Sequence, residues 1–265
     1  MPQRPPRGDR RILIDGGSLG ERVRLDVDDP VLTSGLSVFE TLRTYGGSAV
    51  LLERHLARLA GGAERLGLRC PTPTLRQEVL RVIVGWDCDV KVRITLFGGG
   101  GRSVRATSIP HPPSALSVAV RPWPGPNGID DIKHGARAPW VISVRESGAD
   151  DVLWRAGGHY LEATTGNVLA VCDGTLVTPP LDGRILPGIT RGVLLEVADE
   201  LGIPVCEGPL SVDAVAEELY LSSSLKILAP ITLLNAEPAP GEGPVGLRLR
   251  KGFLARVGLT SRVRE

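Results

Sequence analysis

The clearest pattern in the chain is a strict alternation of apolar and polar residues over positions 89–96. A period of two is that of a β-strand with one buried face, because successive side chains point to opposite sides of a strand. The predicted buried face carries Val90, Val92, Ile94 and Leu96. Glycines occupy residues 98–101 directly afterwards, and we expect a flexible hairpin tip there, since no phosphate-loop lysine follows.

A second pattern, with apolar residues three or four positions apart, predicts helices. It runs over residues 51–66, where charged residues lie beside the apolar stripe. The same reasoning predicts helices at residues 75–86 and 190–201 and a terminal helix from about Val245. In the helix at 190–201 the expected buried stripe consists of Leu194, Val197 and Leu201.

Short apolar runs predict the remaining strands. Residues 11–17 and 37–45 predict an opening hairpin, whose second strand ends before Gly46 and Gly47. Further strands are expected at residues 116–120 and 219–222, along the apolar run to Leu234, and around Val141, Val152, Val168 and Leu176. Strands that alternate with helices indicate the α/β class.

A segment rich in proline and glycine divides the chain. Its prolines cannot continue a strand ladder, and its glycines permit turns. We therefore expect an N-terminal α/β domain at residues 1–121, a linker at 122–128 and a C-terminal α/β domain at 129–265. No internal repeat is visible in either part.

Composition favours a globular protein with a small-molecule partner. The 265 residues are 42% hydrophobic, which allows a sizeable core, and the formal charge of +1 provides no field for nucleic acid or membrane binding. Its four cysteines form no C-x-x-C pair, so we expect reduced thiols and no metal site. Residues 1–11 lack an apolar signal region and no run is long enough to span a membrane, which predicts a cytoplasmic protein.

Lysine is rare in this chain, so each lysine merits inspection. Of 31 basic residues only four are lysines: Lys91, Lys133, Lys226 and Lys251. Lys133 lies between Ile132 and the His134-Gly135 pair, where little bulk surrounds the amine. A desolvated lysine amine can lose its proton and act as a nucleophile or base, although composition and spacing alone favour an ordinary role for Lys133.

Three polar features could bind an anion or a cation. Residues 185–191, Ile-Leu-Pro-Gly-Ile-Thr-Arg, run from a turn into a helix, so the N–H groups of Ile189 and Thr190 could bind phosphate or form an ordinary helix start. The hydroxyls of residues 222–224 end a predicted strand and could also bind phosphate, or form a polar turn. Glu162 precedes a turn of small residues and could bond to that turn or to a cationic partner.

Taken in order, these residues resemble the class IV aminotransferase family, the fold-type IV enzymes that use pyridoxal 5′-phosphate. The likeness spans about residues 35–231. Individual segments are short, but their shared order is specific. The matching segments are 37–43, 55–59, 91–94, 132–133, 148–151, Glu162 with Asn167, 178–180, 186–191, and 218–224 with Pro230.

The resemblance implies a two-domain α/β fold like that of D-amino-acid aminotransferase, with the cofactor in the cleft between the domains, and a homodimer. It makes Lys133 the Schiff-base lysine and Glu162 the carboxylate that pairs with the pyridine nitrogen. Asn167 completes the motif of Glu162 in the cofactor site. The resemblance implies that the phosphate is held by Arg58, by the N–H groups of Ile189 and Thr190, and by the hydroxyl of Ser224.

Two reactions on a primary amine follow from the resemblance. Residues 39–41, Phe-Glu-Thr, and 222–225, Ser-Ser-Ser-Leu, look closer to 4-amino-4-deoxychorismate lyase, which eliminates pyruvate and forms 4-aminobenzoate for folate biosynthesis. We therefore expect the lyase reaction first. The alternative is an aminotransferase of branched-chain or D-amino acids.

The substrate-facing wall departs from the family pattern. Ser34 stands where an aromatic residue is common, and residues 134–137 replace the usual pair after the lysine. Ser34 and Arg93 are candidate substrate contacts, because a guanidinium suits bidentate binding of a carboxylate. For Arg137 a surface ion pair is favoured. These departures also motivate a third reading, a pyridoxal-phosphate-binding protein without turnover.

Overall fold

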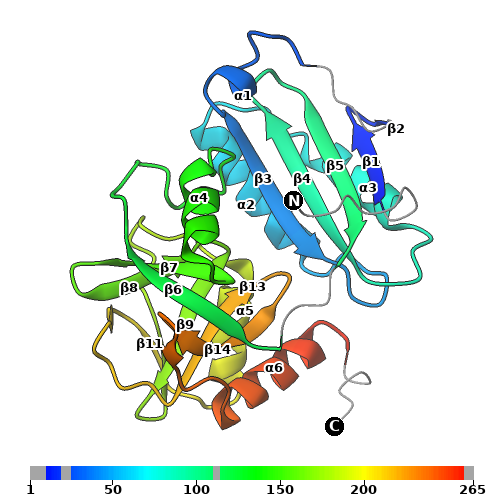
Figure 1. The fold of residues 1–265 in the computed structure, drawn as a ribbon. Helices are drawn as coiled ribbons and strands as arrows, with labels where there is room; N and C mark the ends of the chain where they lie inside the picture. The colour runs from blue at the N-terminus through cyan, green and yellow to red at the C-terminus, as the bar shows by residue number, and fades with distance from the viewer. Residues whose placement is uncertain (1–9, 19–24, 110–113, 260–265) are drawn as a thin grey trace. The chain divides into compact units, whose positions relative to one another are not determined.

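The structure is a computed structural model that describes residues 10–18, 25–109 and 114–259. The chain forms two compact units. Unit 1 comprises Met1–His111 and Ile132–Ala136, and unit 2 comprises Pro112–Asp131 and Arg137–Glu265. Each unit has its own sheet and its own helices (Figure 1).

Unit 1 contains a five-stranded antiparallel sheet in the order β2-β1-β5-β4-β3. Helices α2 and α3 lie against one face of it (Figure 1). The apolar residues of β4 and the stripe of α2 are buried in this layer, as the two periodicities predict. The elements are β1 (Arg10–Ile14), β2 (Gly17–Ser18), α1 (Pro30–Thr33), β3 (Ser37–Arg43), α2 (Leu52–Arg65), α3 (Thr72–Ile83), β4 (Val90–Phe97) and β5 (Arg102–Ser108).

The expected opening hairpin is wrong in its pairing. Strand β1 pairs with β2 and β5, whereas β3 pairs with β4 at the other edge of the sheet. The glycine turn at residues 98–101 accounts for the centre of this sheet, whereas the pairing of β1 with β5 joins segments that are far apart in sequence. The turn joins β4 to β5 through a short loop, whose closure costs little entropy, and so places β5 beside β4.

Unit 2 contains a ten-stranded mixed sheet. Because β8 pairs with both β7 and β9, the strands β8, β9, β13, β14, β6 and β7 close into a ring. Its core includes Val118, Leu153, Val168, Leu221 and Ile231. The elements are β6 (Leu116–Pro122), α4 (Ala138–Ser147), β7 (Asp151–Ala156), β8 (His159–Ala163), β9 (Gly166–Cys172), β10 (Thr175–Thr178), α5 (Ile189–Glu200), β11 (Val205–Glu207), β12 (Leu210–Ser211), β13 (Glu218–Ser223), β14 (Ile227–Leu234), β15 (Glu237–Pro238) and α6 (Pro244–Arg256).

Two local expectations in unit 2 are wrong. Val141 lies in helix α4 rather than in a strand, because a proline starts this helix and Gly148, with a φ of 66°, ends it. The apolar run around Val141 is only partly buried, since Val141 itself is 63% exposed. In α5, Leu194 and Val197 are buried as expected, but Leu201 follows the helix end and is 37% exposed.

The division into units differs from the boundary expected at residues 122–128. Strand β6, which includes Pro122, pairs in parallel with β14 and β7 and so belongs to the sheet of unit 2. The segment Ile132–Ala136 instead lies beside β3, where the Phe39 N–H donates to the Lys133 carbonyl (2.9 Å) and the Gly135 N–H to Ser37 O (2.8 Å). Lys133 is therefore part of unit 1, although we expected it in the C-terminal domain.

Residues 1–9, which hold most of the N-terminus where we expect no signal region, lie outside the described residues. In the three ranges that the structure describes, no helix has both the length and the hydrophobicity needed to cross a bilayer. All four cysteines, Cys70, Cys88, Cys172 and Cys206, are free thiols.

Two helical glycines make a matched test of packing. A Cβ on Gly246 in α6 would overlap the Tyr220 hydroxyl, whereas one on Gly192 in α5 would meet nothing within 4 Å. We expect Gly246→Ala to lower the free energy of unfolding by about 1–3 kcal/mol, and Gly192→Ala to raise it by about 0.5–1 kcal/mol. Urea unfolding measures both, and equal effects of the two substitutions would contradict this packing.

Candidate functional site

Strand β3 presents different groups on its two faces. Val38 and Glu40 point towards α2, as shown by the close approach of Gly62 to Val38 and the contacts of Glu40 with α2 side chains. Phe39 therefore lies on the other face. The Nζ atom of Lys133 is 5.1 Å from the centre of the Phe39 ring, and Cζ of Arg93 is 3.7 Å from it. Two of the predicted site residues thus share one aromatic ring.

On the α2 side, Glu40 holds the predicted phosphate ligand Arg58. The Arg58 Nε and Nη2 atoms donate to the two oxygens of Glu40 at 2.7 and 2.9 Å, a bidentate pair. Glu40 is fully buried, while the Arg58 side chain is 14% exposed. His55, one turn earlier in α2, lies 2.8 Å from Glu40 through Nδ1. The guanidinium of Arg58 is therefore held in a fixed orientation.

The charges of this cluster follow from its burial. Burial raises the pKa of Glu40, but the charge of Arg58 and hydrogen bonds from His55 and Arg58 outweigh it and lower the pKa to about 2. Burial lowers the pKa of His55, and the charges of Arg58 and Lys133 add to this. Together they outweigh the hydrogen bond and the charge of Glu40, which raise the pKa of His55. Glu40 is thus ionised at neutral pH, and neutral His55 donates its Nδ1 hydrogen to it.

Sequence analysis missed Glu40 and His55 as parts of the site. The sequence position of Glu40 could have revealed it, because an acidic residue on the apolar face of a strand needs a buried partner. His55 and Arg58 are three residues apart on one helix, so both can reach the same group.

In unit 2, Glu162 and Asn167 are cross-strand partners at the end of the β8–β9 hairpin. Glu162 Oε2 accepts hydrogen bonds from the Leu186 N–H at 3.0 Å and from Asn167 Nδ2 at 3.3 Å. Asn167 Nδ2 also donates to the Leu186 carbonyl at 2.9 Å. These contacts bring the predicted carboxylate to the segment that leads into α5.

The start of α5 is open to an anion. Gly188 precedes the helix in an extended conformation, and no side chain caps the first turn. A Cβ on residue 188 would overlap Oδ1 of Asn167, so glycine is required at this close approach. The first N–H groups of a helix have no partner within it, and together with the helix dipole they attract phosphate. Ile189 and Thr190 supply these groups.

The serines at the end of β13 and directly after it lie beside the same hairpin. Ser222 is buried, and its hydroxyl donates to the Asn167 carbonyl at 3.4 Å. A Cβ on Gly166 would overlap the Ser222 carbonyl oxygen, which shows how closely the two backbones approach. Ser224 follows in the turn between β13 and β14. Within unit 2, the structure thus brings Glu162, Asn167 and the serine segment together.

The remaining predicted residues have other surroundings. Ser34 is exposed at the end of α1 and donates to the Pro30 carbonyl at 2.8 Å. Arg137 is half-buried rather than a surface residue: Nη2 donates to the Thr164 carbonyl at 2.5 Å and Cζ is 4.6 Å from the Trp140 ring. Burial lowers the pKa of Arg137, although the negative charges of Glu162 and Asp151 oppose this.

Comparison with known proteins gives one consistent family. The model of the family "Amino-transferase class IV" matches residues 37–234, which include parts of both units. A Thermotoga maritima protein named "Probable branched-chain-amino-acid aminotransferase" is 30% identical over 233 residues, 82% of this chain and 85% of the relative. D-alanine aminotransferase of Staphylococcus epidermidis is 24% identical over 273 residues, 92% of this chain and 96% of the relative.

A solved structure is similar over almost the whole chain. The fold IV-transaminase of Curtobacterium pusillum has a TM-score of 0.84 and 26% sequence identity. The match covers 93% of this chain and 99% of that protein.

The buried Glu40 cluster predicts a specific pH dependence. The pKa of Glu40 is lowered from 4.5 to about 2 on folding, so its stabilisation is present above pH 4.5 and is lost as the pH falls towards 2. We expect Glu40→Gln to remove on the order of 3 kcal/mol at neutral pH and to flatten the stability curve between pH 4.5 and 3, as measured by urea unfolding.

Glu53→Gln is the matched control for this measurement. Glu53 pairs with Arg76 at 2.5 Å in the same kind of acid–guanidinium contact, but its side chain is 65% exposed. Solvent screens such a pair, so the variant should keep the wild-type pH dependence. If the free energy of unfolding of Glu40→Gln fell below pH 4.5 as steeply as that of the wild type, the role of the cluster would be contradicted.

Proposed function

The chain belongs to the class IV aminotransferase family, and on this basis we propose that it transfers the amino group of an amino acid to an α-keto acid. It is an enzyme that uses pyridoxal 5′-phosphate and has the α/β fold of the fold-type IV enzymes. The names of its relatives, branched-chain and D-alanine aminotransferases, support this reaction better than the lyase reaction expected from residues 39–41 and 222–225.

We assign the cofactor contacts by chemistry. Bound pyridoxal phosphate supplies an aldehyde that condenses with amines and a ring that accepts electrons from a breaking C–H bond. In the proposal, Lys133 would carry the cofactor and would move the proton at the α-carbon of the substrate. Glu162 would pair with the ring nitrogen, and Asn167 holds Glu162 in place. Arg58, the N–H groups of Ile189 and Thr190, and the Ser224 hydroxyl would hold the phosphate.

The residues present fit this cofactor. The single observation that carries the proposal is the contact of Glu162 with both Asn167 and Leu186, because it puts a carboxylate next to an uncapped helix start within one unit. A ligand with a protonated ring nitrogen and a phosphate matches that pair of charges. In unit 1, the bidentate contact with Glu40 fixes the orientation of Arg58, the proposed phosphate ligand of that unit.

For the substrate we propose a branched-chain amino acid first and a D-amino acid second. The 30% identical relative supports the first, and the D-alanine aminotransferase relatives, which match 92% of this chain, support the second. Arg93 is the proposed ligand of the substrate carboxylate, because it shares the Phe39 ring with Lys133. Ser34 is a second proposed substrate contact. The homodimer and the cytoplasmic location stay predictions.

A panel of amino donors tests the reaction. With 2-oxoglutarate as acceptor, we expect L-leucine, L-isoleucine and L-valine to yield their keto acids, measured by chromatography, faster than D-alanine yields pyruvate. Faster conversion of D-alanine would establish the second substrate class. Pyruvate release from aminodeoxychorismate without an acceptor would establish the lyase, and no turnover of any amine would establish a binding protein.

Substitution of the lysine tests the assignment of Lys133. Borohydride should fix pyridoxal phosphate covalently to the wild-type protein but not to Lys133→Ala, as mass spectrometry of the intact protein can measure. Loss of the amine that moves the proton should also lower kcat by roughly 10²–10⁴-fold. Lys251→Ala, at an exposed position of α6, is the control and should behave as wild type. A fixed cofactor in Lys133→Ala would refute the assignment.

A further inference from the structure

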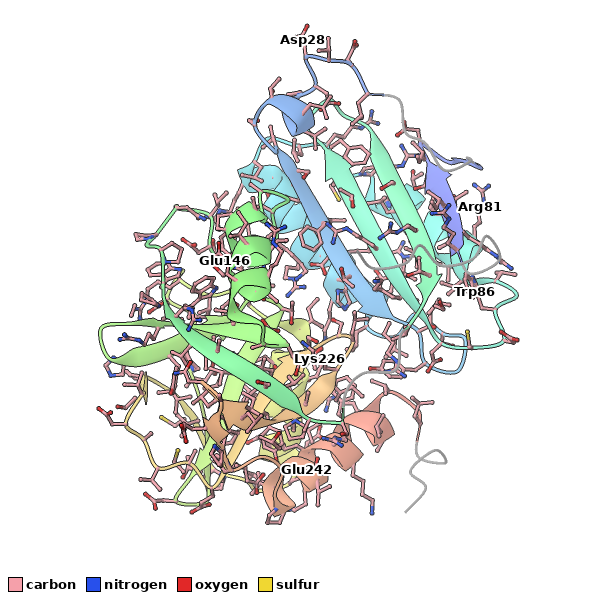
Figure 2. The ribbon with its side chains drawn as sticks, viewed as in Figure 1. Asp28, Arg81, Trp86, Glu146, Lys226 and Glu242 are labelled. Atoms are coloured by element: carbon pink, nitrogen blue, oxygen red, sulfur yellow. The ribbon has the colours of Figure 1, made fainter. Side chains whose placement is uncertain are left out.

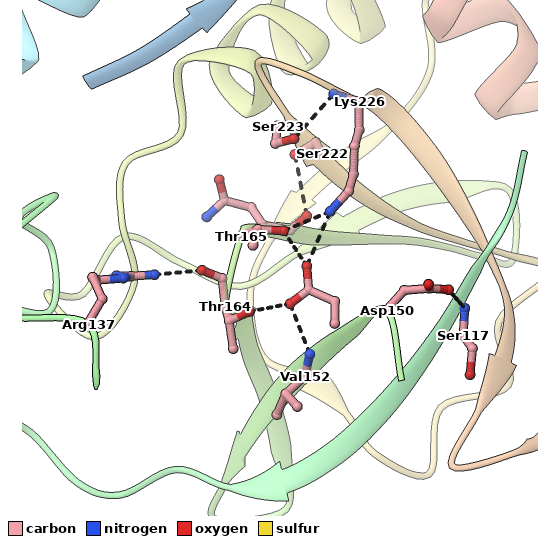
Figure 3. Close-up of polar contacts among 11 residues, drawn as sticks. Ser117, Arg137, Asp150, Val152, Thr164, Thr165, Ser222, Ser223 and Lys226 are labelled. Atoms are coloured by element: carbon pink, nitrogen blue, oxygen red, sulfur yellow. Dashed lines mark hydrogen bonds and ion pairs between the residues drawn. The ribbon is translucent and has the colours of Figure 1, made fainter. Parts of the chain in front are cut away.

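Asp151 is a buried carboxylate that the proposed reaction does not use. It is 0% exposed and accepts hydrogen bonds from the Val152 N–H (2.9 Å), the Thr164 hydroxyl (2.5 Å) and the Thr165 hydroxyl. Lys226 Nζ lies 3.2 Å from its second oxygen (Figure 3). A buried carboxylate needs such partners to replace water. Asp151 draws them from β7, from the β8–β9 turn and from the β13–β14 turn.

Lys226 holds a strained turn. Figure 2 marks it in the segment between β13 and β14, where its N–H donates to the Ser223 hydroxyl at 3.3 Å. Its ammonium also donates to the Thr165 hydroxyl at 2.7 Å. The next residue, Ile227, has a φ of 62°, which a β-branched side chain rarely adopts. Such a conformation persists only where the surrounding contacts hold it.

The two turns that Lys226 joins also carry proposed cofactor ligands. Thr164 and Thr165 connect Glu162 on β8 to Asn167 on β9. Ser224 is two residues before Lys226. Lys226 donates a hydrogen bond to Thr165, and Lys226 and both threonines contact Asp151. These contacts therefore link the turn of Ser224 to the hairpin of Glu162.

We propose that Lys226 is a positioning residue of the cofactor site. Its ammonium, bound to Asp151 and Thr165, fixes the Ser224 hydroxyl relative to Glu162, so that one ligand engages both. This inference rests on the proposed function, in which Ser224 binds the phosphate and Glu162 faces the ring nitrogen. Glu162 is also held by Asn167 and Leu186. Ser224, in contrast, lies in the same turn as Lys226, so loss of Lys226 displaces the phosphate ligand more than the ring ligand.

Pyridoxal, which has the same ring and aldehyde but no phosphate, provides the discriminating ligand. We expect Lys226→Met to weaken binding of pyridoxal phosphate about tenfold, the effect of losing one hydrogen bond to a charged group, and to weaken pyridoxal binding far less. Equilibrium absorbance titration measures both dissociation constants. Lys226→Arg should restore the wild-type ratio of the two constants, and Lys251→Met should not change it.

A variant without either charge separates the proposed effect from a general folding defect. Lys226→Met leaves Asp151 buried without its cation, whereas the Asp151→Asn/Lys226→Met double variant removes both charges. We expect the double variant to fold, as judged by its melting temperature, and still to have the reduced preference for pyridoxal phosphate over pyridoxal. A wild-type preference in this variant would overturn the proposal.

Ser224→Ala separates failure of this inference from failure of the proposed function. If Ser224→Ala leaves the preference for pyridoxal phosphate unchanged, the assignment of the phosphate ligand fails. If Ser224→Ala reduces the preference but Lys226→Met does not, or Lys226→Met weakens both ligands equally, the role of Lys226 is overturned. If both assignments hold, Lys226→Met should have little further effect on the preference in a Ser224→Ala background.

Discussion

One carboxylate oxygen, Oε2 of Glu162, fixes the geometry on which the proposed site of unit 2 depends. It accepts hydrogen bonds from the Leu186 N–H and from the side-chain amide of Asn167. The same amide also donates to the Leu186 carbonyl. The β8–β9 pairing that closes the ring of strands therefore also sets where α5 begins. Because the side chains of Glu162 and Asn167 both bond to backbone groups of Leu186, and also to each other, they fix the spacing between the carboxylate and the helix start.

Both units use a buried carboxylate to hold a cation, but with different geometry. Glu40 binds the planar fork of Arg58 through two hydrogen bonds, which fixes both the position and the orientation of the guanidinium. Asp151 binds the single ammonium of Lys226, and three other donors complete its shell. The first arrangement suits a cation that contacts a ligand directly. The second arrangement suits a contact that holds two turns together, where the position of the backbone matters more than the orientation of the cation.

Elements with their own periodic pattern could be predicted from sequence, and elements defined by distant partners could not. The alternation of β4 and the stripe of α2 appear in the structure because each depends on one buried face. The order of β1 and β3 in the sheet depends on which strand pairs with β5, and no local pattern encodes that. The placement of Lys133 in unit 1 likewise depends on backbone hydrogen bonds to β3. Glu40 and Asp151 escaped notice because their burial depends on these distant contacts.

The structure also explains why sequence motifs indicated the cofactor better than the reaction. The lyase expectation rested on residues 39–41 and 222–225. Glu40 faces α2 and holds Arg58, whereas Phe39 of the same segment lies on the other face of β3, where Lys133 and Arg93 reach its ring. In unit 2, the Ser222 hydroxyl donates to the Asn167 carbonyl. The side chains of Glu40 and Ser222 thus contact proposed cofactor ligands, Arg58 and Asn167. In the proposed function, the choice of substrate depends instead on Arg93, which lies over the Phe39 ring as Lys133 does.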